Sequence, residues 1–354
     1  MMAPSRPSAD ARLGPQPVSR QSAPGSRQDA GPSRPPDLLE VRGLKKYFPI
    51  TAGVLRRTVG HVKAVDDVSF SVREGETLGL VGESGCGKST TGRMVMRVLE
   101  PTAGRIFFRG ADLTAMSGRD LRRIRPQLQM VFQDPYASLD PRMSVEDLLV
   151  EPFLVNRVLG RREAVQRAAA LLKTVGLQED DLRRFPHQFS GGQKQRIGIA
   201  RALTLSPRLI VADEAVSALD VSIQSQILNL LSDLKRQFQL SYIFISHNLA
   251  VVRHLGDRVG VMYLGQLVEV APKTTLYREP KHPYTEALLS AALEPKRTGR
   301  RERIILQGEV PSPSNPPAGC PFHSRCPKVM EVCRSQRPSF REIGPDHRVA
   351  CHLY

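Results

Sequence analysis

The sequence predicts an α/β fold built around a mixed, mainly parallel β-sheet. Short apolar runs repeatedly end in polar residues, helical periodicity separates these runs, and a glycine-rich loop lies between a predicted strand and a predicted helix. The 354 residues are enough for about two or three units that each bury a core. Aromatic residues make up only 5% of the chain and Trp is absent, so aliphatic side chains must fill these cores.

The glycine-rich loop matches the phosphate-binding pattern G-x-x-x-x-G-K-[ST] over residues 82–90. Residues 77–81 before it are predicted to form a buried strand, and Met94, Val95, Val98 and Leu99 after it have helical spacing. The alternative is an ordinary turn between a strand and a helix. We expect nucleotide contacts from the whole loop: Gly82, Glu83, Ser84, Gly85, Cys86, Gly87, Lys88, Ser89 and Thr90.

The chain has a net charge of +16, spread along its length. Such a charge could favour binding to nucleic acid, anionic lipid or acidic ligands. The alternative is that it reflects only a basic composition dominated by Arg. No run of 18 apolar residues and no secretory signal is evident, so we expect a protein of the cytosol or of the cytosolic face of a membrane. In that reducing setting, cysteines indicate metal ligands before disulfides.

The N-terminal part is predicted to begin with a disordered tail, residues 1–36, which is rich in Pro, Ser and Arg. An edge strand follows near Leu39, then a flexible excursion over residues 51–62 and another strand over residues 64–70. Phe48, as first choice, or Tyr47 is a candidate to stack on an adenine ring. Ordinary core packing would explain either aromatic side chain equally well.

Three predicted strands end in residues suited to phosphate chemistry. Gln133 follows the strand at 128–132 and is a candidate to ligate Mg²⁺ or orient water. Asp213 and Glu214 close the apolar strand that begins at Leu209, so Asp213 is a candidate Mg²⁺ ligand and Glu214 a candidate base toward water. His247 follows the strand at 242–245 and is a candidate γ-phosphate contact. A polar strand cap or a solvated histidine is the alternative.

A helical insert is predicted between these strands. Residues 143–185 have helical periodicity, with Gly176 as a stop signal. Ser190-Gly191-Gly192-Gln193 then precedes a helix, where free amides and the helix dipole favour an anion, although Ser190 could also be a simple N-cap. A further helix carries Ile223, Ile227, Leu230 and Leu234 on one face.

In this order the motifs resemble an ATP-binding cassette ATPase. The resemblance covers about residues 38–272 and implies a P-loop NTPase core, here assigned to residues 37–272, with a helical subdomain at about 134–200. It also implies ATP and Mg²⁺ as cofactors and two ATPase subunits packed head to tail. Each ATP would then lie between one subunit's phosphate loop and the Ser190, Gly191, Gly192 and Gln193 of the other, with Asp220 at the interface. Lys88, Gln133, Glu214 and His247 become catalytic residues in this family.

Finer features resemble the ATPase subunits of oligopeptide and dipeptide importers, including relatives that carry nickel, and the second of the two ATPases in such systems above all. These features are residues 132–139, 185–190 and 282–285. The family implies two transmembrane permease subunits, an extracytoplasmic binding protein and a second ATPase, identical or related, with no nucleic acid. Three residues depart from the wider pattern, Phe189, Ala215 and Asp140, and none of them removes a catalytic group.

A small C-terminal extension, residues 273–354, contains Cys320, Cys326, Cys333 and Cys351. Their spacing matches neither a C-x-x-C zinc site nor a common ferredoxin run. The resemblance to peptide-importer ATPases implies a [4Fe–4S] cluster held by these four residues. Zinc is the second possibility and four inert thiols the third.

A rival reading of the whole chain is a soluble ATPase of the same type that acts on DNA or ribosomes, which the charge permits. The chain has one cassette instead of two and no long coiled-coil insertion, which argues against it. A regulatory subunit without turnover would require a missing catalytic group, and none is missing.

Overall fold

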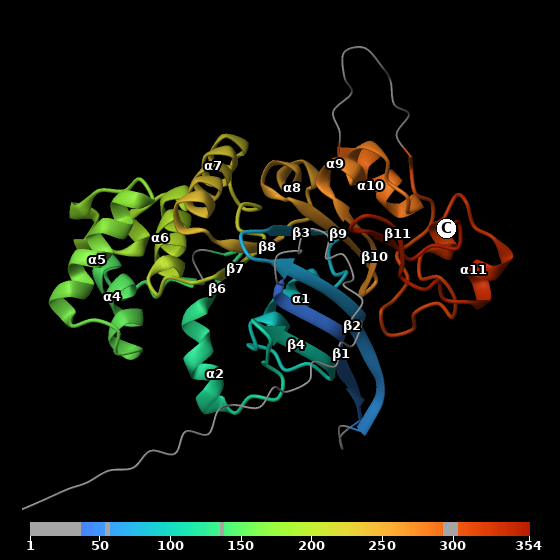
Figure 1. Ribbon diagram of the computed structural model, residues 1–354, viewed down its shortest axis with the longest axis horizontal. Helices are drawn as coiled ribbons and strands as arrows, with labels where there is room; N and C mark the ends of the chain where they lie inside the picture. Colours follow the sequence, from blue (N-terminus) through green and yellow to red (C-terminus); the bar gives the residue numbers. More distant parts are fainter. Residues whose placement is uncertain (1–36, 54–56, 135–137, 293–303) are drawn as a thin grey trace, which may run out of the picture. The chain divides into compact units, whose positions relative to one another are not determined.

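The computed structural model describes residues 37–53, 57–134, 138–292 and 304–354 (Figure 1). The tail predicted to be disordered, residues 1–36, lies outside the described residues. Within the described residues, no helix is both long enough and apolar enough to cross a membrane.

The smaller sheet is antiparallel, with strand order β2-β1-β4-β5. Its strands are β1 (Asp37–Ala52), β2 (Arg57–Arg73), β4 (Ala103–Phe108) and β5 (Ala111–Asp112). The expectation of a flexible excursion over residues 51–62 is wrong, because Ile50 pairs with Gly60 and Thr51 with Thr58. Much of this hairpin is exposed, so cross-strand hydrogen bonding forms it without the apolar alternation that a sequence reveals.

The larger sheet is mixed, with strand order β11-β12-β10-β9-β3-β8-β7-β6. Its parallel half consists of β3 (Thr77–Val81), β6 (Leu128–Val131), β7 (Leu209–Asp213), β8 (Ser241–Ile245) and β9 (Arg258–Tyr263). The antiparallel half adds β10 (Gln266–Pro272), β11 (Arg341–Gly344) and β12 (His347–Val349). Most of the parallel strands are buried along their whole length, which explains their continuous apolar sequences. The predicted α/β class with an antiparallel edge region is therefore confirmed.

Helices connect these strands. They are α1 (Lys88–Val95), α2 (Gly118–Ile124), α4 (Val145–Val155), α5 (Arg161–Thr174), α6 (Gly191–Leu203), α7 (Val221–Phe238), α8 (Leu249–Leu255), α9 (Lys273–Arg278), α10 (Pro283–Ala292) and α11 (Glu331–Ser335). Short 3₁₀ turns lie at η1 (Arg125–Gln127), η2 (Glu179–Arg183), η3 (Pro186–Gln188) and η4 (His323–Arg325). The predicted stop at Gly176 is confirmed, since α5 ends at Thr174 and Gly176 has φ of 79°.

The first helix is shorter than predicted. Arg97 has a left-handed φ of 49°, so α1 does not continue to Val98 and Leu99. Val98 is 64% exposed and does not extend the apolar face of the helix.

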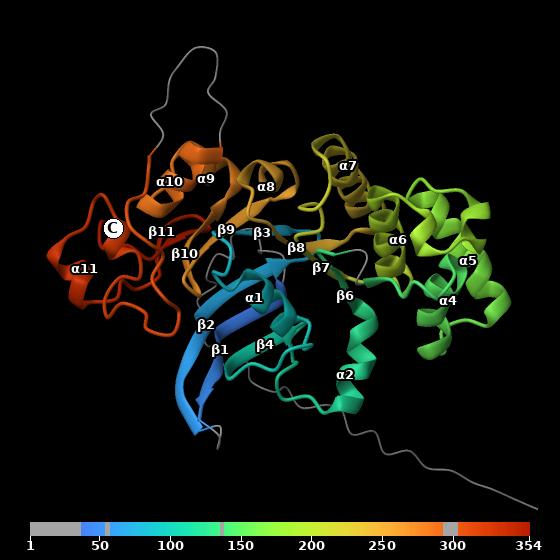
Figure 2. The same ribbon diagram turned by 180° about the vertical axis from the view of Figure 1, so that it is seen from behind.

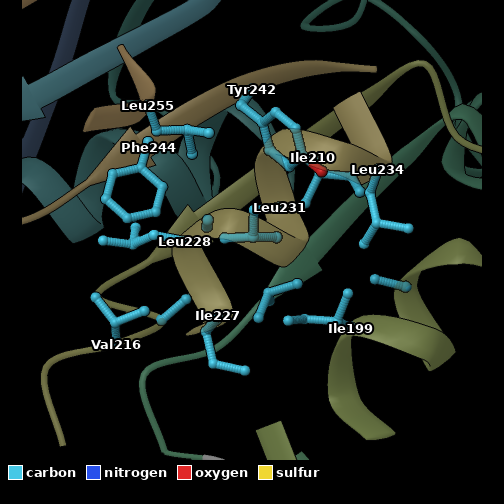
Figure 3. Packing of buried hydrophobic residues seen from close by; sticks show 14 of the residues in the cluster. Ile199, Ile210, Val216, Ile227, Leu228, Leu231, Leu234, Tyr242, Phe244 and Leu255 are labelled. Atoms are coloured by element: carbon cyan, nitrogen blue, oxygen red, sulfur yellow. The ribbon is translucent and has the colours of Figure 1, made fainter. Parts of the chain in front are cut away.

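The helices of the insert gather at one end of the molecule, and the C-terminal segment lies at the other (Figures 1 and 2). Between them, α7 covers the sheet through Ile227, Leu228, Leu231 and Leu234, which are all buried (Figure 3). Two of the residues predicted for this face, Ile227 and Leu234, are fully buried, while Ile223 and Leu230 pack partly buried beside the same cluster. This packing fixes α7, which follows β7, against the centre of the sheet.

The C-terminal segment joins the sheet by a buried polar contact. β12 pairs with β10, and Glu269 of β10 is completely buried. Its carboxylate accepts hydrogen bonds from the backbone amides of Lys281 and His282, both at 2.9 Å, and its Oε1 lies 2.9 Å from Nε2 of His347. Burial alone would raise the pKa of Glu269, but the hydrogen bonds, led by that with His347, outweigh it and lower the pKa below its ordinary value.

Replacing Glu269 with Gln should lower the free energy of unfolding by about 1–3 kcal/mol, because one oxygen that accepts buried hydrogen bonds becomes an amide donor. A depressed folded-state pKa stabilises above the ordinary value of 4.5, and this stabilisation is lost as pH falls through the folded-state pKa. Urea titrations at neutral and acidic pH should therefore show the two proteins converging at low pH.

The matched control is Glu279→Gln, which removes an exposed carboxylate that forms an ion pair with Lys281. This variant should unfold like the parent, because an exposed ion pair contributes little. Equal destabilisation of both variants would contradict the role given to Glu269.

Candidate active site

The phosphate loop follows β3 and leads into α1. Gly82 and Gly87 have φ of 152° and 101°, and a Cβ atom on either would lie 2.2 Å from a backbone oxygen of a neighbouring segment. Only glycine fits these two positions. Gly87 is the N-cap of α1 and provides no side-chain cap, so the first amides of the helix remain available to an anion.

The last part of the loop contains two side chains, Lys88 and Ser89, that form defined hydrogen bonds. Lys88 is 4% exposed, and its Nζ donates to the carbonyl oxygens of Gly82 and Glu83, both at 2.9 Å. Ser89 Oγ donates to Oδ1 of Asp213 at 2.6 Å. The loop and the end of β7 are thus joined directly, although 124 residues separate the two side chains.

Strand register brings the other predicted residues to this edge. Ile245 of β8 pairs with Leu80 of β3 on one side and with Asp213 of β7 on the other. Val131 of β6 pairs with Ala212 of β7. Gln133 follows Val131 by two residues and therefore lies just beyond the end of β6, on the same side as Glu214. Because these strands are parallel, all their carboxyl ends meet beside the phosphate loop.

Glu214 lies at the centre of this group. Its Oε2 accepts a hydrogen bond from Nε2 of Gln133 at 3.0 Å and lies 3.6 Å from Nδ1 of His247. The carboxylate side chain is 14% exposed, whereas His247 is 55% exposed. Glu214 has a left-handed φ of 47°, a conformation that costs a non-glycine residue energy and is found most often at functional sites.

Asp213 is buried, and within the described ranges its side chain accepts a hydrogen bond from the uncharged Ser89. It is 2% exposed, and burial raises its pKa despite the opposing hydrogen bond from Ser89. A divalent cation would relieve this unfavourable burial. The nearby donors, the hydroxyl of Ser89, the carboxylate of Asp213 and the amide oxygen of Gln133, are the hard oxygen ligands that Mg²⁺ prefers. These residues therefore fit the metal.

The two aromatic candidates differ in freedom. Tyr47 donates its hydroxyl proton to Asp66, which also accepts a hydrogen bond from Arg337 at 2.8 Å. Phe48 is 38% exposed, with Nζ of Lys46 5.2 Å from its ring centroid. The Phe48 side chain is therefore partly exposed, whereas the hydroxyl of Tyr47 is fixed by its hydrogen bond. Adenine stacking by either residue stays a prediction.

The serine and glycine motif lies elsewhere on the molecule. Ser190 caps α6: its Oγ accepts from the amide of Gln193 at 3.3 Å, and Gln193 Oε1 accepts from the amide of Ser190 at 3.0 Å. Both views place α6 well to the side of α1 (Figures 1 and 2). Asp220, the N-cap of α7, is exposed and makes no capping hydrogen bond. The simple N-cap reading of Ser190 is therefore correct locally, and its remaining surface is free for a partner.

The four C-terminal cysteines are free thiols that converge from separate segments. Cys320 precedes η4, Cys326 follows it, Cys333 lies in α11, and Cys351 follows β12. Burial raises the pKa of Cys320 to about 11, and the three other thiols lie near enough to add to this. Among the residues described, no three His, Cys, Asp or Glu side chains come together as ligands of one metal ion.

Two residues at the site were missed from the sequence. Arg325 forms an ion pair with Glu83 at 2.9 Å, and the hydroxyl of Tyr284 accepts the backbone proton of Glu83 at 2.9 Å. Residues 282–285 stand out in the sequence as a motif, but no local pattern connects them, or Arg325, to a loop about two hundred residues away.

A phosphate loop, a carboxylate strand end and a second motif on a separate helical region define an ATPase of the ATP-binding cassette class. Two family models match the chain: "ABC transporter" over residues 65–217 and "Oligopeptide/dipeptide transporter, C-terminal region" over residues 268–333.

Full-length relatives agree with these models. The chain is 56% identical over 320 residues to the oligopeptide transport ATP-binding protein AppF of Bacillus subtilis, covering 90% of this chain and 97% of that protein. It is 51% identical to a probable peptide ABC transporter ATP-binding protein of Sinorhizobium fredii, covering 89% and 90%. The chain belongs to the ATP-binding subunits of the oligopeptide/dipeptide family of ABC transporters.

Solved structures show the same fold. One is a dimeric, post-hydrolysis state of the ATP-binding cassette MJ0796 bound to ADP and Pi, with a TM-score of 0.59 and 26% identity over 66% of this chain and 98% of that one. Another is cbiO1 from Clostridium perfringens, with a TM-score of 0.59 and 28% identity over 69% and 91%. The protein is an ATPase that uses ATP, and Mg²⁺ is the general cofactor of this class.

Replacing Glu214 with Gln should nearly abolish steady-state ATP hydrolysis while leaving ATP binding intact, because the amide cannot accept the proton of the attacking water. Colorimetric phosphate release and equilibrium ATP binding measure the two properties separately. Retained turnover would refute the role of Glu214. Glu279→Gln, an exposed change outside the site, is the control and should hydrolyse ATP like the parent.

Proposed function

We propose that this subunit hydrolyses ATP to power the import of peptides through a membrane complex. The main support is the agreement of family and relatives, which are described as oligopeptide or peptide transport ATP-binding proteins, over nearly the full chain. The site supports turnover, because the residues needed for positioning and charge stabilisation are present at the edge of the sheet.

The residues of the site have separate tasks in this proposal. Lys88 neutralises the β- and γ-phosphates. Ser89, Gln133 and Asp213 would hold Mg²⁺, which when bound offsets phosphate charge. Glu214 accepts a proton from the attacking water, with Gln133 holding its carboxylate through the 3.0 Å hydrogen bond. His247, exposed beside Glu214, supports the γ-phosphate.

The site is completed by a second ATPase subunit, identical or related. Ser190 and Gly192 lie at the start of α6, which lies to the side of α1, and this separation supports a role at the ATP of a partner. Gly191 and Gln193 belong to the same helix start, and the exposed Asp220 would lie at the interface. The dimeric arrangement of the solved cassette bound to ADP and Pi supports this pairing.

A groove near the insert supports docking to permease subunits on the cytosolic face of the membrane. It has a volume of about 700 Å³ and lies between the end of β6 and helices α4 and α6. Phe132 and Val155 line it and are 44% and 73% exposed, so they present apolar surface to a partner. We assign the groove to a short cytosolic helix of a transmembrane permease, which would present apolar residues to it. An extracytoplasmic binding protein would deliver the peptide.

The test of this function is transport of labelled peptides by the complex reconstituted in lipid vesicles with both ATPases, both permeases and the binding protein. ATP-dependent accumulation is expected, and it should disappear with Glu214→Gln. Failure to transport any peptide from a mixed library, by a complex that still hydrolyses ATP, would contradict peptide as the cargo.

The same vesicles test the groove. Val155→Asp should abolish co-purification with the permeases and transport, because it buries a charge in an apolar contact, while ATP hydrolysis by the isolated subunit continues. Val59→Asp, at a site 65% exposed on the β1–β2 hairpin, is the matched control and should transport normally. Equal loss in both variants would remove the groove from the proposal.

We further propose that the four C-terminal cysteines hold a [4Fe–4S] cluster. The proximity of Cys326, Cys333 and Cys351 to Cys320 supports it, because a [4Fe–4S] cluster is bound by four cysteine thiolates. Zinc and unliganded thiols are the competing outcomes.

Anaerobically purified protein should contain about four irons per chain and absorb visible light. Cys326→Ser should reduce both, because it removes one of four ligands. Cys86→Ser, which changes a buried cysteine in the phosphate loop, is the control for metal content. Colourless, iron-free protein would reject the cluster, and zinc in its place would favour the second possibility.

A further inference from the structure

Glu83 of the phosphate loop is held by the C-terminal segment. The guanidinium of Arg325 contacts both carboxylate oxygens of Glu83, at 2.9 and 3.2 Å. The hydroxyl of Tyr284 accepts the backbone proton of Glu83, and the carbonyl oxygen of Glu83 accepts from Nζ of Lys88. One residue therefore links the lysine that binds phosphate to a segment that begins about two hundred residues later.

The carboxylate of Glu83 lies within the loop that we expect to bind a triphosphate. A negative charge there would repel the phosphates unless another group neutralised it. The Glu83 side chain is 29% exposed and that of Arg325 only 9%, so solvent screens this pair less than a surface pair. Arg325 therefore offsets the negative charge of Glu83 beside the groups that attract phosphate, Lys88 and the first amides of α1.

Arg325 is itself held rigidly. It ends η4 and lies over the ring of Tyr263, 5.9 Å from the centroid. Tyr263, Tyr284 and Phe322 pack on one another, with centroids 4.7–5.4 Å apart, and all three are at most 1% exposed. A guanidinium on this support keeps its place without the entropy loss that a free arginine would have on binding.

We propose that Arg325 is a positioning residue of the nucleotide site, which sets ATP affinity by neutralising and holding Glu83. The C-terminal segment then contributes directly to the ATP site of its own subunit. Attachment of the segment does not depend on this pair, because Arg73 bonds Asp346 at 2.6 Å, Arg337 bonds Asp66 at 2.8 Å, and β12 pairs with β10.

The experiment measures equilibrium binding of Mg·ATP by the full chain in a Glu214→Gln background, so that hydrolysis does not consume the ligand. Arg325→Met should weaken binding roughly five- to tenfold, the size expected for one uncompensated charge near a triphosphate. In the parent background, KM should rise by a similar factor and kcat should change less. Arg325→Lys keeps the charge and should retain most of the affinity.

The double variant Glu83→Gln/Arg325→Met should return to within about twofold of the parent, because both charges are gone. The matched control is Arg73→Met, the same substitution in another ion pair of the C-terminal segment. Arg73 is the last residue of β2, and the whole of β3, about 16 Å of strand, lies between it and the loop along the chain. This control should lower thermal stability without changing ATP affinity.

Two results would overturn the proposal in favour of a purely structural contact. One is that Arg325→Met binds ATP like the parent, and the other is that the double variant binds ATP as weakly as the single variant. If Arg325→Met does not fold, Glu83→Gln decides: binding weaker than the parent overturns the proposal, and unchanged or tighter binding supports it. Lys88→Ala tests the site itself, since unchanged ATP binding there would place the nucleotide elsewhere.

Discussion

Parallel pairing of β3 with β8 and of β8 with β7 is the constraint on which this site depends. It places the ends of three buried strands in one row, at Leu80, Ile245 and Asp213. Gln133, Glu214 and His247 then leave the sheet within one or two residues of that row. The strands can hold this register because their side chains are buried on both faces, where a shift by one residue would disrupt all packing.

Buried charge is the second theme of the structure. Asp213 and Lys88 are 2% and 4% exposed, and in the part of the chain that the structure describes Asp213 bonds the hydroxyl of Ser89 while Lys88 bonds backbone carbonyls. Such burial is unfavourable in the free protein and becomes favourable when Mg²⁺ and phosphate arrive. Glu214 adds a left-handed backbone conformation at the same place. The site is therefore less stable without its substrate than an apolar edge would be, which is common where binding has to be strong.

The C-terminal segment is more closely integrated with the ATPase than an appended extension. It adds two strands to the main sheet, its His347 bonds a glutamate buried in β10, and its Arg325 reaches the phosphate loop. A change in this segment can therefore reach the phosphate loop through the contact between Arg325 and Glu83. The cysteines lie close to this contact, because Arg325 directly precedes Cys326 in the chain.

The sequence by itself determined the α/β class, the phosphate loop and the polar strand ends at Gln133, Asp213, Glu214 and His247. These depend on local chemistry: glycine conformations, apolar runs and the residue after each run. Only the tertiary structure decided that residues 51–52 pair with residues 57–58 as antiparallel strands, that α1 ends before Val98, and that Arg325 and Tyr284 touch Glu83. Such contacts depend on how distant segments pack, and an arginine 242 residues away leaves no periodic signal in the chain. Nine consecutive residues were therefore enough to predict the phosphate loop, whereas Arg325, which balances the charge of Glu83, could not be predicted from the sequence.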